Sequence, residues 1–265
     1  SGLDGYLTPI EAPLATMDQL QRVHPLDYIA YIHASSPIHG IVHLDPDTAM
    51  SPGTWHAALH AAGAGCEAVD RVMRGEEDNA FCAVGPPGDH ASAAQAMGFC
   101  FFNNVAVAMR HALTVWPVSR VAVIDFDVHH GNGTEAVFAG DDQVLMCGTF
   151  QHPFYPYSGT EHPAANMCNV PLAAGTRGEG FRQAVTDIWL PRLHDFQPEM
   201  IFISAGFDAH REDDMASLGL VEDDYVEAGR RLCARSLGAQ RGSPFSCAGR
   251  CVNGCEWPRL AMSIG

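Results

Sequence analysis

Apolar residues recur along the chain in two alternating patterns, one typical of helices and one typical of buried strands. Four segments have apolar side chains at helical spacing: 53–74, 103–116, 179–196 and 221–237. Four short runs lie between or beside them and are rich in strand-forming residues: 79–84, 120–128, 143–150 and 199–208. Gly75 follows the first helical segment as a candidate C-cap. The pattern predicts strands that alternate with helices.

Near-continuous apolar strands that alternate with helices are typical of a parallel sheet covered on both faces. The fold class is therefore predicted to be α/β, a three-layer sandwich with a central, mainly parallel sheet flanked by helices. Parallel sheets carry their functional sites where the strands end. Polar residues follow three of the predicted strands, in "GPPGDH" (85–90), "DFDVHHGN" (125–132) and "AGFDAHRED" (205–213). We expect these three loops to converge on one edge of the sheet.

Composition narrows the class of protein. The chain has 265 residues and a hydrophobic fraction of 47%, enough for one large domain with a sizeable core. Its 31 acidic residues outnumber 15 basic ones and give a net charge of -16, which disfavours nucleic acid as a partner. All the basic residues are arginine, which excludes Schiff-base chemistry and phosphate binding by a P-loop lysine.

The chain is expected to be cytoplasmic and not to enter a membrane. No apolar run approaches the roughly 20 residues of a membrane span, and the first residues resemble no signal peptide. Single cysteines scattered among apolar residues are typical of free thiols in a reducing compartment: Cys66, Cys82, Cys100, Cys147 and Cys168. Four further cysteines near the C-terminus lack the spacing of a zinc module.

The stretch "DFDVHH" (125–130) places acids and histidines at the end of an apolar run. Side chains alternate along a strand, so Asp125, Asp127 and His129 are predicted to share one face. Residues two apart on a strand lie about 6.6 Å apart at Cα, close enough for Asp127 and His129 to bind one ion. The alternative is that Asp127 caps the next helix and His129 is a loop histidine. Three such groups on one face favour a metal site.

Asp208 is the natural third ligand for this site. It follows the apolar strand through the turn "AGF" (205–207) and is therefore expected at the same edge of the sheet. A lone aspartate in that position would usually be a helix N-cap. Three protein ligands with nitrogen and oxygen donors suit a catalytic zinc ion and leave a position for water. The same donors also suit Fe(II) or Mn(II), so the residues alone leave the metal open.

Five motifs occur in order along the chain: "PPGDHA" (86–91), "GFCFFNN" (98–104), "DFDVHHGNGT" (125–134), "FYPYSG" (154–159) and "SAGFDAHRED" (204–213). Together they resemble the histone deacetylase superfamily, hydrolases of acyl amides with the arginase-deacetylase fold. The Asn in "HHGNG" and the Ala-His pair after "GFD" are similar to the class II branch. The resemblance spans roughly residues 1 to 237.

The resemblance implies roles for individual residues in a zinc-dependent amidohydrolase. Asp127, His129 and Asp208 would bind Zn²⁺, and metal-activated water would attack the acyl carbonyl. His90 would be the general base and then the acid that protonates the leaving amine. Asn132 would accept a hydrogen bond from His90 and fix its tautomer.

The resemblance also implies a substrate site for an acylated lysine peptide or an acylated small amine. Phe99 and Tyr155 would form the walls of the acyl-lysine tunnel, and Gly98 would lie beside the substrate carbonyl. Both aromatic side chains could equally well be core residues from sequence alone. Asp47 would lie at the rim, where the family uses an acid to hold the substrate backbone. An excess of acidic residues would also attract cationic substrates.

The chain departs from the family pattern at three positions near the site. Asp89 replaces the first histidine of a tandem pair and would face Asp125, the acid that otherwise orients that histidine. Two like charges in a partly buried pocket should raise one pKa, so a shared proton or a captured cation is expected, with reduced turnover and a shifted pH optimum. Gly85 replaces an arginine, and Gly148 replaces a serine that helps to hold a monovalent cation, which argues against a K⁺ site.

The two ends of the chain also depart from the pattern. We expect residues 1–237 to form a deacetylase-like domain, incomplete at both ends, and 238–265 to be an aberrant, irregular tail produced by a frame shift or truncation. No tyrosine follows Tyr225, whereas the family places an oxyanion-stabilising tyrosine in a loop after a further strand. Exposed sheet edges would lower the stability of the fold and favour association into a homo-oligomer.

Three functions fit these residues. The first is a zinc-dependent deacetylase with activity weakened by the missing tyrosine. The second is a catalytically inactive fragment or acyl-lysine-binding module that keeps zinc without turnover. The third, an arginase-like dimanganese hydrolase, needs an Asp-x-His-x-Asp order that "DFDVHHGN" lacks.

Overall fold

Six parallel strands form the central sheet of the protein. The structure is a computed structural model that describes residues 7–236 and 259–264. The strand order is β3-β8-β7-β4-β5-β6, and every neighbouring pair is parallel. The bounds of the strands in chain order are β3 Asn79–Ala83, β4 Val121–Asp125, β5 Val144–Gln151, β6 Met167–Leu172, β7 Met200–Ala205 and β8 Arg259–Ile264.

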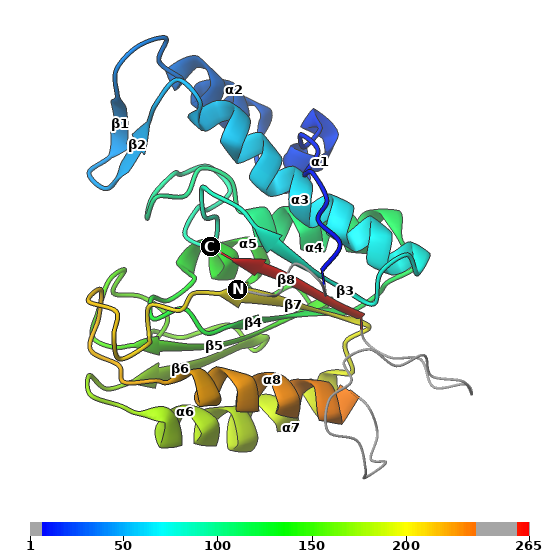
Figure 1. Ribbon diagram of the computed structural model, residues 1–265, viewed down its shortest axis with the longest axis vertical. Coiled ribbons are helices and arrows are strands. Elements are labelled where there is room, and N and C mark those ends of the chain that lie inside the picture. Colours follow the sequence, from blue (N-terminus) through cyan, green and yellow to red (C-terminus); the bar gives the residue numbers. More distant parts are fainter. Residues whose placement is uncertain (1–6, 237–258, 265) are drawn as a thin grey trace.

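Helices cover both faces of this sheet, so the predicted three-layer α/β sandwich is confirmed (Figure 1). One face carries α3 Thr54–Arg74, α4 Asn104–Val115 and α5 Asn132–Phe138, with α1 Met17–Gln21 and α2 Leu26–Ser35 packed outside them. The other face carries α6 Gly178–Ala184, the π-helical segment η2 Val185–Trp189, α7 Leu190–Phe196 and α8 Glu222–Ser236.

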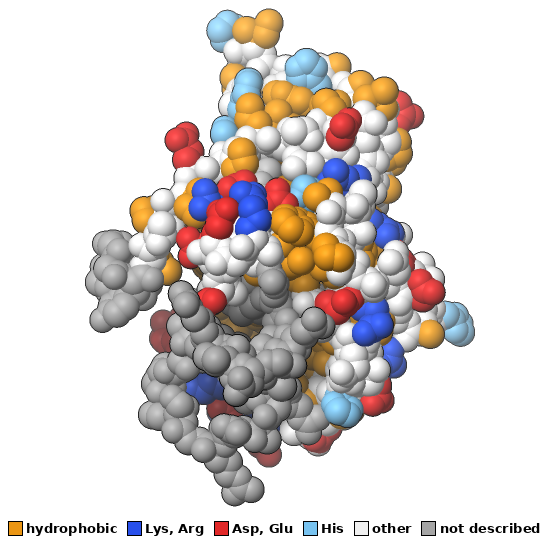
Figure 2. All heavy atoms as spheres, turned by 90° about the vertical axis from the view of Figure 1, so that its right-hand side faces the viewer, with side chains coloured by type: hydrophobic (Ala, Val, Ile, Leu, Met, Phe, Trp, Pro, Cys, Tyr) orange, Lys and Arg blue, Asp and Glu red, His pale blue; other side chains and the backbone are white. Residues whose placement is uncertain are grey.

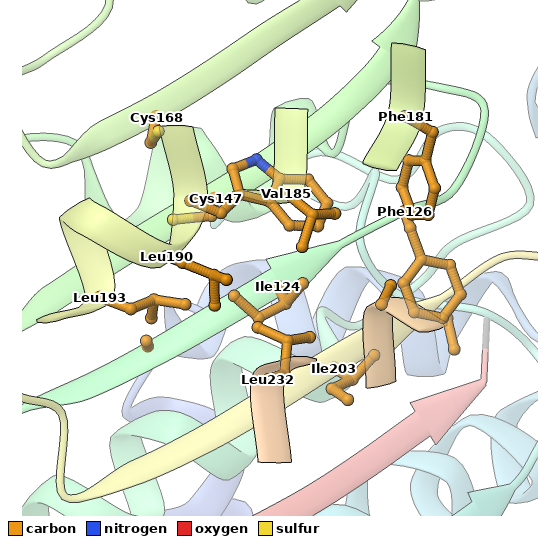
Figure 3. Packing of buried hydrophobic residues seen from close by; sticks show 14 of the residues in the cluster. Ile124, Phe126, Cys147, Cys168, Phe181, Val185, Leu190, Leu193, Ile203 and Leu232 are labelled. Carbon is orange, nitrogen blue, oxygen red and sulfur yellow. The ribbon is translucent and has the colours of Figure 1, made fainter. Parts of the chain in front are cut away.

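Two apolar cores lie on the two faces of the sheet because strand side chains alternate. In β4, Ala122 and Ile124 pack with α6, η2, α7 and α8, whereas Val121 and Val123 pack with α3 and α4. Figure 3 shows Ile124 and Ile203 of the sheet facing Leu190, Leu193 and Leu232 of the helices. All five residues of β4 are buried, as expected of a central strand in a parallel sheet.

The predicted helices lie within one or two residues of the observed ones. Helix α3 ends at the predicted C-cap, because Gly75 adopts a left-handed φ of 72° and its N–H bonds to carbonyls of the last turn. The segment predicted as one helix over 179–196 is α6, η2 and α7 in sequence. Its π-helical part precedes Pro191, which has no N–H to donate to the preceding turn.

Several elements were not predicted from the sequence. They are α1, α2, α5, β6 and the antiparallel hairpin of β1 Val42–Asp45 and β2 Thr48–Met50. Strand β4 also ends at Asp125, three residues before the predicted end, because the chain then turns through the motif that contains Asp127 and His129. These elements are short, which leaves little room for a periodic apolar pattern.

The expectation of an irregular tail is wrong for its last residues. Residues 259–264 form β8, which pairs with β3 on one side and β7 on the other. The sheet has a place for this strand because β3 and β7 do not pair directly, and the run "RLAMSI" supplies backbone groups to both neighbours. The rest of the predicted tail, 238–258 and 265, lies outside the described residues, and the division at residue 237 stays a prediction.

The surface mixes charges of both signs. Figure 2 shows arginines beside acidic side chains on one face, and ion pairs of this kind join Arg71 to Glu67 and Arg74 to Asp70 on α3. The five cysteines predicted to be free are buried, and none of them forms a disulfide. None of the described helices is both long and apolar enough to cross a bilayer.

Candidate active site

The three polar loops meet at the carboxyl edge of the sheet, as expected from the parallel topology. His90, after β3, contacts Asn132, after β4, with 2.8 Å between Nδ1 and Oδ1. His129, after β4, lies 3.0 Å from Asp208, after β7, measured from Nδ1 to Oδ2. Central strands β4 and β7 are neighbours, and this brings the last two loops together.

Asp127, His129 and Asp208 form the cluster that could hold a metal ion. Their candidate ligand atoms all lie within 4.8 Å of one another. His129 Nδ1 lies 3.0 Å from both Asp127 Oδ1 and Asp208 Oδ2, so two carboxylates face one imidazole nitrogen. Two oxygens and one nitrogen from partly buried or buried residues are a donor set suited to zinc. The residues therefore fit the ion that their resemblance implies.

The contact between Asp127 and His129 arises from a turn, which corrects the prediction of a continuous strand. After β4 ends, the N–H of Asp127 donates to Asp125 Oδ1 at 3.1 Å, and the N–H of His129 donates to Asp127 Oδ1 at 2.7 Å. The N–H of Val128 donates to Asp208 Oδ1 at 2.9 Å. These bonds fix the carboxylates against the backbone, and Asp127 Oδ1 and Asp208 Oδ2 both approach His129 Nδ1.

The electrostatics of the cluster favour a positive charge at its centre. Burial opposes the charged form of His129, but hydrogen bonds to Asp127 and Asp208 outweigh this and raise its pKa to about 10. Burial, followed by repulsion from Asp208, raises the pKa of Asp127 to about 6 despite its bond to His129. A divalent cation would replace the proton on His129 and balance the two carboxylates.

Gly206 is required by the packing of this cluster. A Cβ at position 206 would collide with the carboxylate of Asp127. We predict that Gly206→Ala lowers zinc affinity roughly 10- to 100-fold. The added methyl group would displace the Asp127 carboxylate, and the loss of a contact that supports a metal ligand has an effect of this size. Gly229→Ala is the matched control, since a Cβ at position 229 meets open space. Equal zinc affinity of the two variants in a competition titration would contradict the packing argument.

His90 lies beside the cluster and is oriented by its neighbours. Asn132 Oδ1 can only accept, so His90 Nδ1 carries the hydrogen and Nε2 keeps the lone pair. The His90 ring is buried and lies edge-on to His129 with 5.9 Å between centroids. Gly98 has a φ of 58° and packs so closely on the His90 ring that a Cβ there would meet ring atoms at 2.5 Å.

Asp89 and Asp125 form an acidic pair within the site. They are 6% and 2% exposed, and each has one buried carboxylate oxygen, Oδ2, with no hydrogen-bond partner among the described residues. Burial, then the charge of Asp89, raises the pKa of Asp125 well above its usual range. This agrees with the expectation that one pKa of the pair rises. Asp89 Oδ2 lies 4.0 Å from His90 Nε2.

Two aromatic side chains, Tyr155 and Phe154, contact the imidazoles of the site. Tyr155 lies edge-on to both His90 and His129, with centroid distances of 5.7 and 6.0 Å. Phe154 stacks on the His129 ring at 5.3 Å, a contact that sequence reasoning missed although the residue lies in the motif "FYPYSG". Phe99 is 53% exposed with a φ of 65°, which places it at the surface instead of in the core.

Asp47 contacts protein groups at the rim. It accepts a hydrogen bond from the Gly98 N–H at 3.0 Å, and the neighbouring Thr48 hydroxyl accepts one from the Phe99 N–H at 3.1 Å. The β1–β2 turn therefore holds the left-handed backbone of Gly98 and Phe99. A pocket of about 390 Å³ opens beside Phe99 and is lined by Asp47, Gly85 and Pro86 among others. Gly148 lies in β5 directly opposite Asp125.

Fold and site together define a three-layer α/β sandwich with an Asp-His-Asp cluster and an imidazole beside it. Residues 2–244 match the histone deacetylase domain, and the chain belongs to this family. It is 40% identical over 232 residues to a histone deacetylase-like amidohydrolase of Pseudomonas aeruginosa, covering 85% of this chain and 61% of that one. It is 36% identical over 226 residues to a probable deacetylase of Archaeoglobus fulgidus, covering 83% and 62%.

The fold is shared with solved structures of the family. A crystal structure of the HDA15 HD domain superposes with a TM-score of 0.85 at 27% identity, covering 99% of this chain and 74% of that one. The chain spans about three fifths of the length of the two relatives named above.

Proposed function

We propose that the chain is a zinc-dependent amidohydrolase that removes acyl groups from lysine side chains or from small amines. The observation that carries this proposal is the cluster of Asp127, His129 and Asp208, whose ligand atoms lie within 4.8 Å, next to an oriented His90. The names of the relatives, a deacetylase-like amidohydrolase and a probable deacetylase, support the same reaction.

Zinc fits the site by donor type, and Asp127, His129 and Asp208 would hold it. When bound, the ion supplies Lewis acidity that polarises an acyl carbonyl and makes water a stronger nucleophile. Fe(II) suits the same donors, so metal identity is part of the proposal.

His90 carries the proton transfers. Asn132 keeps the hydrogen on Nδ1, so Nε2 faces the site with a lone pair and accepts a proton from the attacking water. The resulting imidazolium then donates this proton to the leaving amine, which could not depart as an anion. Phe99 and Tyr155 would flank the acyl-bearing chain, and Gly98 would lie beside its carbonyl because it packs against the His90 ring.

The proposed rim role of Asp47 changes with the structure. The Asp47 carboxylate already accepts a hydrogen bond from the Gly98 N–H. Asp47 would therefore act on the substrate through its negative charge, and through its hold on the backbone that positions Phe99. A carboxylate here favours substrates with a cationic group near the acyl-lysine or acyl-amine.

Asp89 is proposed to weaken turnover, and its replacement tests this. In Asp89→His the like charge beside Asp125 disappears, so the pKa of Asp125 should fall. We expect kcat/KM to rise roughly tenfold or more, within the range of acid-base catalysis, and the limb of the pH-rate profile governed by this pair to move to lower pH. Asp89→Asn is the control and should lower the pKa of Asp125 without the gain in rate. An unchanged rate and profile in Asp89→His would refute the proposal.

A catalytically inactive zinc-binding or acyl-lysine-binding module is the second candidate. The acidic pair of Asp89 and Asp125 favours it. Incubation of the zinc-loaded chain with an acetyl-lysine peptide separates the two functions. Release of acetate that a hydroxamate blocks supports the hydrolase, and saturable peptide binding without release supports the module.

A further inference from the structure

The loop 154–159 brings Phe154 and Tyr155 into the candidate site, and a partly buried polar network holds it in place. Ser158 Oγ lies 2.7 Å from His130 Nδ1. The carbonyl of Gly159 accepts a hydrogen bond from Asn169 Nδ2 at 2.9 Å. The loop is therefore fixed at its carboxyl end by two contacts to residues outside it.

Glu135 joins these two contacts from α5. Its Oε2 lies 2.7 Å from His130 Nε2 and accepts from Asn169 Nδ2 at 2.7 Å. The hydrogen bond from His130 is the main reason that the pKa of Glu135 lies below its usual value. Because a carboxylate accepts, His130 Nε2 carries the hydrogen, and in neutral His130 the Nδ1 atom accepts from the Ser158 hydroxyl.

Close packing completes the network. The His130 ring is 3% exposed and lies 4.7 Å from the ring of Phe150 in β5. Gly159 has a φ of 89°, and a Cβ there would lie 2.7 Å from His130 Cδ2. The glycine is thus needed both for its conformation and for its approach to the imidazole. Neither His130 nor Glu135 belongs to the cluster of potential metal ligands found among the described residues.

We propose that His130, supported by Glu135, is a positioning residue that sets the aromatic wall of the acyl site through Ser158. The inference rests on the proposed function, because the wall matters only if an acyl-bearing chain binds beside it. Through the loop, His130 fixes Phe154 against His129 and Tyr155 against His90. Its effect is on substrate binding, since neither His130 nor Glu135 contributes to the cluster of potential metal ligands among the described residues.

Three variants isolate the hydrogen bonds. His130→Phe keeps a ring against Phe150 and removes both polar contacts, whereas Ser158→Ala removes only the contact to the loop. We expect KM for an acetyl-lysine peptide to rise roughly five- to tenfold in both, as the loss of one hydrogen bond implies, with kcat changed less than about twofold. Ser158→Thr keeps the hydroxyl and should restore a KM close to that of the wild type. His194→Phe, an exposed position on α7, is the matched control for His130→Phe.

Limited chymotrypsin digestion reports the loop without any enzymatic activity. Tyr157 is 74% exposed and is followed by Ser158, so it offers a cleavage site that a loosened loop would present better. Cleavage after Tyr157 should be roughly tenfold faster in Ser158→Ala and His130→Phe than in the wild type, Ser158→Thr and His194→Phe, because cleavage follows local opening.

The outcomes separate this inference from the proposed function. If the wild type hydrolyses no acyl peptide, the proposed function fails, and the digestion arm still decides whether the loop is held by His130. Equal cleavage and equal KM in Ser158→Ala and Ser158→Thr would overturn the inference. Loss of bound zinc in a folded His130→Phe, with KM unchanged, would also overturn it, because the residue would then act on the metal cluster. If His130→Phe does not fold, the two Ser158 variants decide.

Discussion

Replacing Asp208 with asparagine should nearly abolish zinc binding. Asp208 supplies one of two carboxylates that face His129, and no other described residue joins the cluster to replace it. Losing a supporting contact costs roughly 10- to 100-fold in metal affinity, so loss of a ligand should cost at least about 100-fold. The measurement is a competition titration of the metal-free chain with zinc and a chromophoric chelator.

The control for this substitution lies in the same loop. Asp214→Asn makes the same change of charge at an exposed position and should leave the zinc affinity within about twofold of the wild type, as expected of a screened surface charge. A thermal unfolding scan checks that both variants fold. If Asp208→Asn binds zinc as tightly as Asp214→Asn, the ligand set is wrong.

His90→Ala should remove turnover while zinc binding persists. His90 is the imidazole whose Nε2 faces the site and whose Nδ1 is held by Asn132. General acid-base catalysis contributes typically 10²- to 10⁴-fold, so kcat should fall by about that factor with a smaller change in KM. His56→Ala, at an exposed position on α3, is the matched control.

Two results would count against this assignment of the base. Full activity of His90→Ala would mean that another group takes the proton. Asp89 is the first candidate, because its Oδ2 lies 4.0 Å from His90 Nε2. Loss of zinc in His90→Ala would make His90 a ligand. The zinc content of the purified variant, measured beside its rate, distinguishes the two.

Sequence reasoning predicted four of the sheet's strands from short apolar runs, and the metal cluster from the parallel topology that these strands imply. The apolar runs at β4, β5 and β7 are long enough to identify, and their carboxyl ends must share an edge in a parallel sheet. The joint position of Asp127, His129 and Asp208 followed from this topology. The roles assigned to them stay proposals until metal is measured.

Other parts of the site depend on contacts that a linear pattern does not encode. Phe154 stacks on His129, and Ser158 contacts His130 from 28 positions away, through a loop whose sequence suggests no periodic element. Asp47 contacts Gly98 across 51 positions because a short hairpin, β1–β2, folds over that backbone. The sequence motif "FYPYSG" was the available signal for Phe154, since it contains two neighbouring aromatics.

The strand β8 illustrates the limit of periodicity arguments. Its six residues are too few to stand out after a segment rich in cysteine, arginine and glycine. The strand is recognised only in the sheet, where it lies between β3 and β7 and pairs with the backbone of both. Strand pairing therefore provides information that local propensity does not.

The central claim is that Asp127, His129 and Asp208 hold a zinc ion that serves acyl amide hydrolysis with His90. It is tested most directly by adding zinc stepwise to the metal-free chain and following acetate release from an acetyl-lysine peptide. We predict that the rate rises until one equivalent of zinc is bound, a stoichiometry set by one cluster of three ligands among the described residues, and then stays constant. Zinc binding at one equivalent with no acetate released at any addition would contradict the account.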